Sequence, residues 1–145
     1  MDASRVEHFM KLSLKALKLD YVDLYLMHGP IGVKYVDDNT VFPIEGDTIA
    51  YDMSTDLVSI WKSMEAQVTA GRAKTIGVSN FGVAQIERVV NASKIKPSNL
   101  QVEAHVWFQQ KKLREACKKH GMTFTAYAPL GSPGRAASPI ASKGL

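Results

Sequence analysis

The sequence predicts an α/β protein with a parallel sheet, because segments of helical spacing alternate with short apolar segments along the chain. Crossover helices between consecutive strands require parallel pairing with right-handed connections. Both an open doubly wound sheet and a partial (β/α)8 TIM barrel fit this order. Against a dinucleotide-binding doubly wound sheet, no G-x-G-x-x-G sequence opens any of the expected helices.

Each element can be placed from its spacing and its end signals. Helical stripes predict helices over about 4–18, 57–68, 83–90 and 113–120, and short apolar runs predict strands over 21–27, 75–78, 100–104 and 122–127. Ser54, Thr55 or Asp56 is expected to cap the second helix. Gly71 and Gly121 are expected to end the second and fourth helices, since glycine is the usual residue after a helix.

A long connection, residues 31–55, follows the first predicted strand. Connections of this length are uncommon and are usually functional or disordered. Tyr35, Phe42 and Tyr51 give this one apolar surface to bury. We therefore expect it to overhang the end of the first strand as a pocket wall.

Composition sets the protein class. The 145 residues, 46% hydrophobic and 22% charged, are ordinary for a soluble single domain. The net charge of +4 is small and scattered, which argues against a nucleic-acid partner. The single cysteine, Cys117, excludes an internal disulfide and suits a reducing compartment. No membrane-length apolar run and no signal sequence are visible, so a cytoplasmic location is expected.

Candidate site residues, all but Leu130 polar, stand at or near the end of every predicted strand. They are His28 after the first, Ser79 and Asn80 at the second, Gln101 in the third, and Tyr127, Leu130 and Ser132 from the fourth onward. An imidazole can orient a carbonyl or pass a proton near neutral pH. Amides and an aromatic face suit a ring that carries a carboxamide, such as nicotinamide. The alternative is that these residues have a purely structural role and only cap the ends of the strands.

Other polar residues have structural explanations. Asp23, inside a strand, is expected to be a buried, hydrogen-bonded structural carboxylate, and His105 a satisfied turn or core histidine. His8 and His120 lack the paired spacing of a zinc site, so no metal is expected. Cys117 should be inert core.

Four motifs resemble the aldo-keto reductase family. They are residues 19–28 (LDYVDLYLMH), 71–81 (GRAKTIGVSNF), 100–105 (LQVEAH) and 126–132 (AYAPLGS). The resemblance implies a barrel enzyme that reduces aldehydes and ketones with NADPH. It implies that His28 orients the substrate carbonyl, that Ser79, Asn80 and Gln101 hold the nicotinamide carboxamide, that Tyr127 stacks on the ring, and that Leu130 and Ser132 lie along the pyrophosphate. Gly29, Val106 and Ala128 depart from the family pattern.

The resemblance also implies what this chain carries of the family fold. Residues 1–145 are expected to form a partial aldo-keto reductase domain, truncated at both ends and covering about strands four to seven of the barrel. None of its tyrosines lies in a motif that matches the family's proton donor, so the chain alone is expected to be inactive. The alternative is a non-catalytic truncated protein with at most weak nucleotide or partner binding. The full-length form is expected to be a monomer, while the fragment, with strands apolar on both faces, is expected to self-associate.

Overall fold

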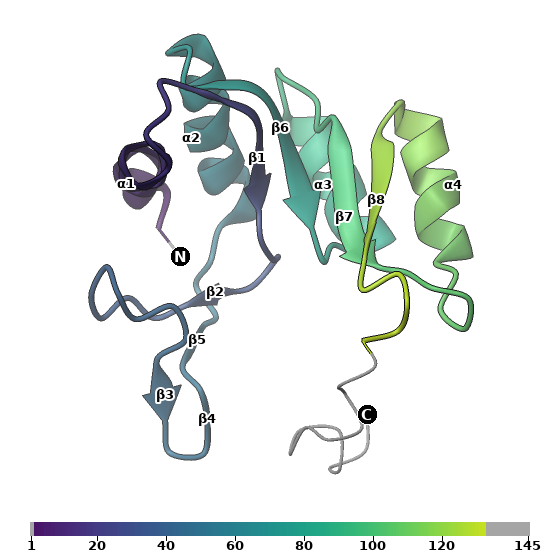
Figure 1. Ribbon diagram of the computed structural model, residues 1–145, viewed down its shortest axis with the longest axis horizontal. Coiled ribbons are helices and arrows are strands. Elements are labelled where there is room, and N and C mark those ends of the chain that lie inside the picture. Colours follow the sequence, from purple (N-terminus) through teal and green to yellow (C-terminus); the bar gives the residue numbers. More distant parts are fainter. Residues whose placement is uncertain (1, 133–145) are drawn as a thin grey trace.

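A single four-stranded parallel sheet forms the centre of the computed structural model, which describes residues 2–132 (Figure 1). Its strands are β1 (Val22–Met27), β6 (Ala73–Ser79), β7 (Asn99–Glu103) and β8 (Thr123–Tyr127). They lie in the spatial order β1-β6-β7-β8, and every neighbouring pair is parallel. The predicted α/β class and the parallel order are therefore confirmed.

Helices connect the strands and cover one face of the sheet (Figure 1). They are α1 (Val6–Leu17), preceded by the 3-10 turn η1 (Ala3–Arg5), α2 (Leu57–Thr69), α3 (Val83–Ala92) and α4 (Lys111–His120). Asp56 caps α2, because its side chain accepts a hydrogen bond from the Val58 amide at 3.1 Å. Gly71 and Gly121 follow the helices that they were expected to end, both with positive φ.

The hydrophobic core lies between the sheet and these helices. Trp61 of α2 and Ile86 of α3 are fully buried against Ile76, Val78 and Leu100 of the strands. The indole N–H of Trp61 finds a partner in the carbonyl of residue 95, at 3.0 Å. The apolar stripe that predicted each of these helices is thus the side of the helix that packs against the sheet.

The opposite face of the sheet is largely polar. On β6, β7 and β8 it carries the alternate residues Thr75, Gly77, Ser79, Asn99, Gln101, Glu103, Thr123, Thr125 and Tyr127. The side-chain amide of Asn99 donates to the hydroxyls of Thr123 and Thr125, both at 2.8 Å. These three strands were expected to be apolar on both faces. That expectation is wrong, because the face away from the helices is polar and some of its side chains bind one another by hydrogen bonds.

Glycine at position 77 lets β6 and β7 approach closely on this face. A Cβ at Gly77 would lie 2.6 Å from the carbonyl oxygen of Asn99 and 2.8 Å from a methyl group of Leu26. A larger side chain at this position would therefore have to displace the backbone of β7, at a cost in stability.

The 31–55 connection contains two short antiparallel ladders. One pairs β2 (Gly32–Val33) with β5 (Tyr51–Asp52), and the other pairs β3 (Ile44–Glu45) with β4 (Thr48–Ile49). The sequence predicted no strands here, since two-residue strands show no alternation of apolar and polar residues. The connection is therefore ordered by its own backbone pairing.

Asp23 differs from its predicted environment. Its carboxylate is 81% exposed and lies 2.7 Å from the ammonium group of Lys74. Asp23 stands near the start of β1, which is at the edge of the sheet, so no further strand covers it within the described residues. The predicted hydrogen bonding is confirmed, and the predicted burial is wrong.

Across residues 2–132, no helix is both long enough and apolar enough to cross a membrane.

Candidate functional site at the carboxyl ends of the strands

His28 directly follows β1 and is exposed at the carboxyl edge of the sheet. It lines a cavity of about 600 Å³ together with Phe9 of α1, Tyr25 of β1, and Val33 and Tyr35 of the connection. Sites for small molecules have volumes in this range and are lined mainly by apolar side chains. The predicted pocket wall is confirmed, because the 33–41 part of the connection lines the same cavity as His28.

Tyr25, which lines this cavity, is partly buried, and this burial changes the pKa of its phenol. Burial raises the pKa of the Tyr25 phenol above its ordinary value of 10. The phenol is therefore fully protonated at neutral pH and is a weaker acid than a tyrosine in water.

Asn80 joins four strands at this edge. Its side-chain N–H donates to the backbone carbonyl of His28 at 2.8 Å, and its side-chain carbonyl accepts from the hydroxyl of Tyr127 at 2.8 Å. Its backbone N–H donates to the carbonyl of Gln101 at 3.0 Å. The turn requires a φ of +61° at this residue, which asparagine tolerates better than most residues. The sequence predicted Asn80 at the site but not this role as the junction.

Ser79 and Gln101 are neighbours on the polar face. They are paired in register across β6 and β7, with Ser79 only 2% exposed and Gln101 partly buried. Within the described residues, no hydrogen bond engages the Ser79 hydroxyl or the Gln101 side-chain amide. A primary amide offers two donors and two acceptor positions, so Asn80 also keeps half of its capacity. This donor and acceptor set fits a carboxamide-bearing ring.

Tyr127 ends β8 and leaves 39% of its surface exposed beside this amide set. The chain then turns sharply, with Gly131 at φ +76° and Ser132 at φ +50°. Leu130 is 84% exposed. Within residues 2–132, no hydrogen bond links the side chain of Leu130 or Ser132 to the other predicted site residues. The structure thus connects His28, Asn80 and Tyr127 directly, places Ser79 and Gln101 beside them, and leaves Leu130 and Ser132 in the adjoining turn.

His105 lies in the loop after β7, so its predicted place in a turn is confirmed, but the prediction that its ring is satisfied is wrong for one of the two ring nitrogens. Its backbone pairs with that of Phe108, and its ring Nε2 lies 3.2 Å from a carboxylate oxygen of Glu103. Its Nδ1 is buried without a partner in the described structure. Trp107, beside it, is 85% exposed.

The described residues hold no cluster of three or more His, Cys, Asp or Glu side chains able to bind a metal ion. Cys117 is buried in the core, as expected, and burial raises the pKa of its thiol.

Comparison with known proteins gives one consistent answer. The family model described as "Aldo/keto reductase family" matches residues 1–138. The chain is 44% identical over 131 residues to aldo-keto reductase family 1 member A1 of Xenopus tropicalis, covering 90% of this chain and 39% of that protein. It is 43% identical over 134 residues to aldo-keto reductase family 4 member C11 of Arabidopsis thaliana, covering 92% and 40%.

Solved structures agree. An aldose reductase from Schistosoma japonicum superposes with a TM-score of 0.84 at 38% identity, covering 97% of this chain and 47% of that one. An aldose reductase from Giardia lamblia gives 0.82 at 32% identity, covering 90% and 42%. The parallel arc is thus part of a TIM barrel, and the chain spans about two fifths of the length of the curated relatives it matches.

Proposed function

The chain belongs to the aldo/keto reductase family, and on that premise we propose that it forms part of an NADPH-dependent enzyme that reduces aldehydes or ketones to alcohols by hydride transfer. Family membership supports the oxidoreductase class and a small carbonyl substrate. The observation that carries the proposal is the Asn80 junction. It holds the turn after β1, which bears His28, and the aromatic ring of Tyr127 at one edge of the sheet.

His28 is proposed as the catalytic residue that orients the carbonyl. His28 is exposed at the end of β1, and no hydrogen bond within the described residues engages its ring. An imidazole N–H is therefore free to donate to a carbonyl oxygen, whose negative charge grows during reduction.

The cofactor is proposed to lie against the polar face of the sheet. Ser79, Asn80 and Gln101 would hold the nicotinamide carboxamide, Tyr127 would stack on the ring, and Leu130 and Ser132 would lie along the pyrophosphate. When bound, NADPH supplies the hydride. The unengaged polar groups of Ser79 and Gln101 support this placement, because a carboxamide would satisfy them without breaking existing hydrogen bonds.

Cofactor binding needs no proton donor, but reduction of a carbonyl does. The alkoxide formed by hydride transfer needs a proton donor, and no tyrosine of this chain lies in a motif that matches the family's donor. The raised pKa of Tyr25 makes its phenol a poor substitute. We therefore propose that residues 1–145 bind the cofactor but reduce carbonyls only at background rates. A cytoplasmic location and a monomeric full-length protein are part of the same proposal.

Calorimetric titration with NADPH tests the cofactor face. Gln101→Ala and Tyr127→Ala should weaken NADPH binding by about tenfold each, a change of about 1.4 kcal/mol. His28→Ala should leave binding unchanged, as should the control Gln109→Ala in the exposed loop before α4. In the full-length enzyme, His28→Ala should instead lower kcat.

Two results would contradict the proposal. Equal losses of NADPH affinity for His28→Ala, Gln101→Ala and Tyr127→Ala would remove the division of roles. An absence of NADPH binding by the unsubstituted chain would favour the alternative of a truncated protein without cofactor.

A further inference from the structure

We propose that Glu103, held in place by His105, strengthens the binding of the oxidised cofactor, NADP+, relative to the reduced cofactor, NADPH. Glu103 supplies a negative charge beside the nicotinamide ring, and His105 is the positioning residue that keeps this charge in place. The inference rests on the proposed function, because it requires that the nicotinamide lie against Gln101 and Tyr127.

Glu103 stands between two of the proposed cofactor contacts. It is the last residue of β7 and lies on the same face of the sheet as Gln101, two residues earlier. It is paired in register with Tyr127, the last residue of the neighbouring strand β8 (Figure 1). Paired residues on neighbouring strands lie about 5 Å apart, so the side chains of Glu103 and Tyr127 leave the sheet side by side.

His105, in the loop after β7, holds the carboxylate of Glu103. Its ring Nε2 lies 3.2 Å from one carboxylate oxygen, and the side chains of His105 and Glu103 are only 12% and 17% exposed. An ionised carboxylate can only accept hydrogen bonds, so the imidazole donates through Nε2. Its Nδ1 is buried and has no acceptor for a second ring proton within the described residues. A neutral imidazole therefore fits this site, and the pair carries one negative charge.

Contacts around His105 fix the position of this charge. The backbone N–H of His105 donates to the carbonyl of Phe108 at 3.1 Å, and the N–H of Phe108 donates back at 2.9 Å. The rings of Trp107 and Phe108 flank the imidazole, with ring centres 6.2 and 6.1 Å away. The side-chain N–H of Gln110 donates to the backbone carbonyl of Glu103 at 3.0 Å. The carboxylate is therefore preorganised.

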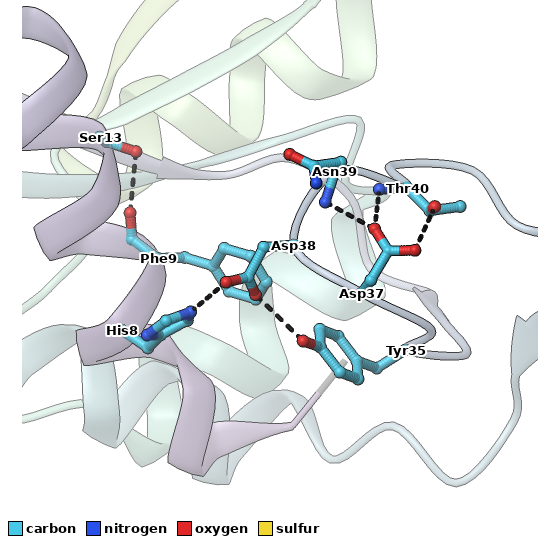
Figure 2. A network of polar contacts seen from close by, with 8 residues as sticks. All are labelled: His8, Phe9, Ser13, Tyr35, Asp37, Asp38, Asn39 and Thr40. Atoms are coloured by element: carbon cyan, nitrogen blue, oxygen red, sulfur yellow. Dashed lines mark hydrogen bonds and ion pairs between the residues drawn. The ribbon is translucent and has the colours of Figure 1, made fainter.

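Two other contacts between a histidine and a carboxylate occur within residues 2–132, and both lie elsewhere. His8 and Asp38, both exposed, join α1 to the 31–55 connection (Figure 2). His120 and Glu87 join α4 to α3, on the helix-covered face of the sheet. Of the three pairs, that of Glu103 and His105 is the one beside the proposed nicotinamide site, and the pair of His8 and Asp38 offers a matched control.

The two oxidation states of the cofactor differ in charge at the nicotinamide. The ring of NADP+ is positively charged and that of NADPH is neutral, whereas both carry the same adenosine and phosphate groups. A fixed carboxylate beside the ring therefore attracts the oxidised form and leaves the reduced form nearly unaffected. Opposite charges within about 10 Å of each other at a protein surface change an affinity by about three- to tenfold. Glu103 thus changes the ratio of the two affinities.

Calorimetric titration of the 145-residue chain with NADP+ and with NADPH measures this ratio. Glu103→Gln removes the charge and keeps the shape of the side chain, and Glu103→Asp keeps the charge. His105→Phe removes the N–H donor, and His105→Gln keeps one. His8→Gln is the control, because it alters a histidine–carboxylate contact away from the cofactor face. Far-UV circular dichroism first verifies that each variant is folded.

The titrations have a defined expected result. Glu103→Gln should weaken NADP+ binding by about three- to tenfold and change NADPH binding by less than about twofold. His105→Phe should shift the ratio in the same direction, while Glu103→Asp, His105→Gln and His8→Gln should leave it nearly unchanged. Equal losses for both cofactor forms in Glu103→Gln, or no loss, would overturn the proposal. An unshifted ratio in His105→Phe would overturn the positioning role.

A measurement on the unsubstituted chain needs no variant to fold. Salt screens charge attraction, so the affinity for NADP+ divided by that for NADPH should fall between about 0.02 and 0.5 M NaCl. Salt effects on the phosphate contacts cancel in this ratio, and a ratio independent of salt would overturn the charge effect. If the chain binds neither cofactor form, the proposed function fails. If it binds both with a ratio that Glu103→Gln does not change, this inference alone is overturned.

Discussion

The hydroxyl of Tyr127 donates a hydrogen bond to the side chain of Asn80 at 2.8 Å, although β7 separates the strands that these residues end. The same side chain reaches the carbonyl of His28 on the other side. A single amide therefore sets the spacing between the aromatic ring and the imidazole-bearing turn, which no contact between adjacent strands could do.

Two substitutions of Asn80 should distinguish the contribution of its side-chain hydrogen bonds to stability from that of its left-handed backbone conformation. Asn80→Gly loses both side-chain bonds but accepts the positive φ, whereas Asn80→Ala also pays about 1 kcal/mol for the left-handed conformation. We expect Asn80→Ala to unfold in urea at lower free energy than Asn80→Gly by that amount. Tyr127→Phe, which loses one bond, should cost about 1 kcal/mol. Equal stability of the Gly and Ala variants would show that the backbone of this turn relaxes.

Gly77→Ala should destabilise the sheet by about 1–3 kcal/mol, the usual cost of overpacking. The new methyl group would meet the Asn99 carbonyl at 2.6 Å. Gly29→Ala is the matched control, because a Cβ there has no neighbour within 4 Å and its φ is not positive. Urea denaturation measures both variants. A Gly77→Ala protein as stable as Gly29→Ala would disprove the close approach of β6 and β7.

Glu65 should anchor the connection between α3 and β7. Its buried carboxylate accepts hydrogen bonds from the backbone N–H groups of Lys94 and Ile95, at 2.6 and 2.8 Å. Glu65→Ala leaves both donors unpaired and should lower the free energy of unfolding by about 2–3 kcal/mol. Glu65→Gln, which keeps an acceptor oxygen, should lose less. The exposed Glu115→Ala should change stability by less than about 0.5 kcal/mol, and a similar loss in both Ala variants would contradict the anchor.

Asp56 should make the capping of α2 sensitive to acid. The hydrogen bond from the Ser59 hydroxyl, at 2.6 Å, is the main reason that the pKa of Asp56 lies below its ordinary value of 3.8. A lowered pKa in the folded state stabilises the protein above the unfolded value and is lost as the pH falls through the folded value. The stability difference between the unsubstituted chain and Asp56→Asn should therefore shrink between about pH 5 and pH 2. A constant difference would contradict this, and Asp20→Asn, in the exposed turn before β1, is the control.

The helices and the parallel strands could be predicted from the sequence because each buries one face, so that apolar side chains recur along it at a regular spacing. The apolar stripe containing Trp61 is the side of α2 that meets the core, and the glycines at 71 and 121 end their helices through their backbone freedom. Local patterns of this kind need no knowledge of distant residues.

Other features could not be predicted because they depend on contacts between residues that are distant in the sequence. The pairing of Asn80 with Tyr127 joins residues 47 positions apart, and nothing in either motif specifies it. The exposure of Asp23 follows from the position of β1 at the sheet edge, not from its own neighbours in sequence. The polar inner face was missed because small and hydroxyl residues such as Thr75 interrupt the strand pattern without revealing which face they occupy. The roles assigned to the seven site residues stay predictions until the titrations are made.

The 31–55 connection also affects how this protein can change over generations. Its ladders pair only with each other, β2 with β5 and β3 with β4, and none of them joins the parallel sheet. Insertions, deletions or an exchanged segment at this place leave the register of the sheet intact. Sequence variation can therefore accumulate in this segment without disturbing the core, and a laboratory library restricted to these residues should yield few misfolded proteins.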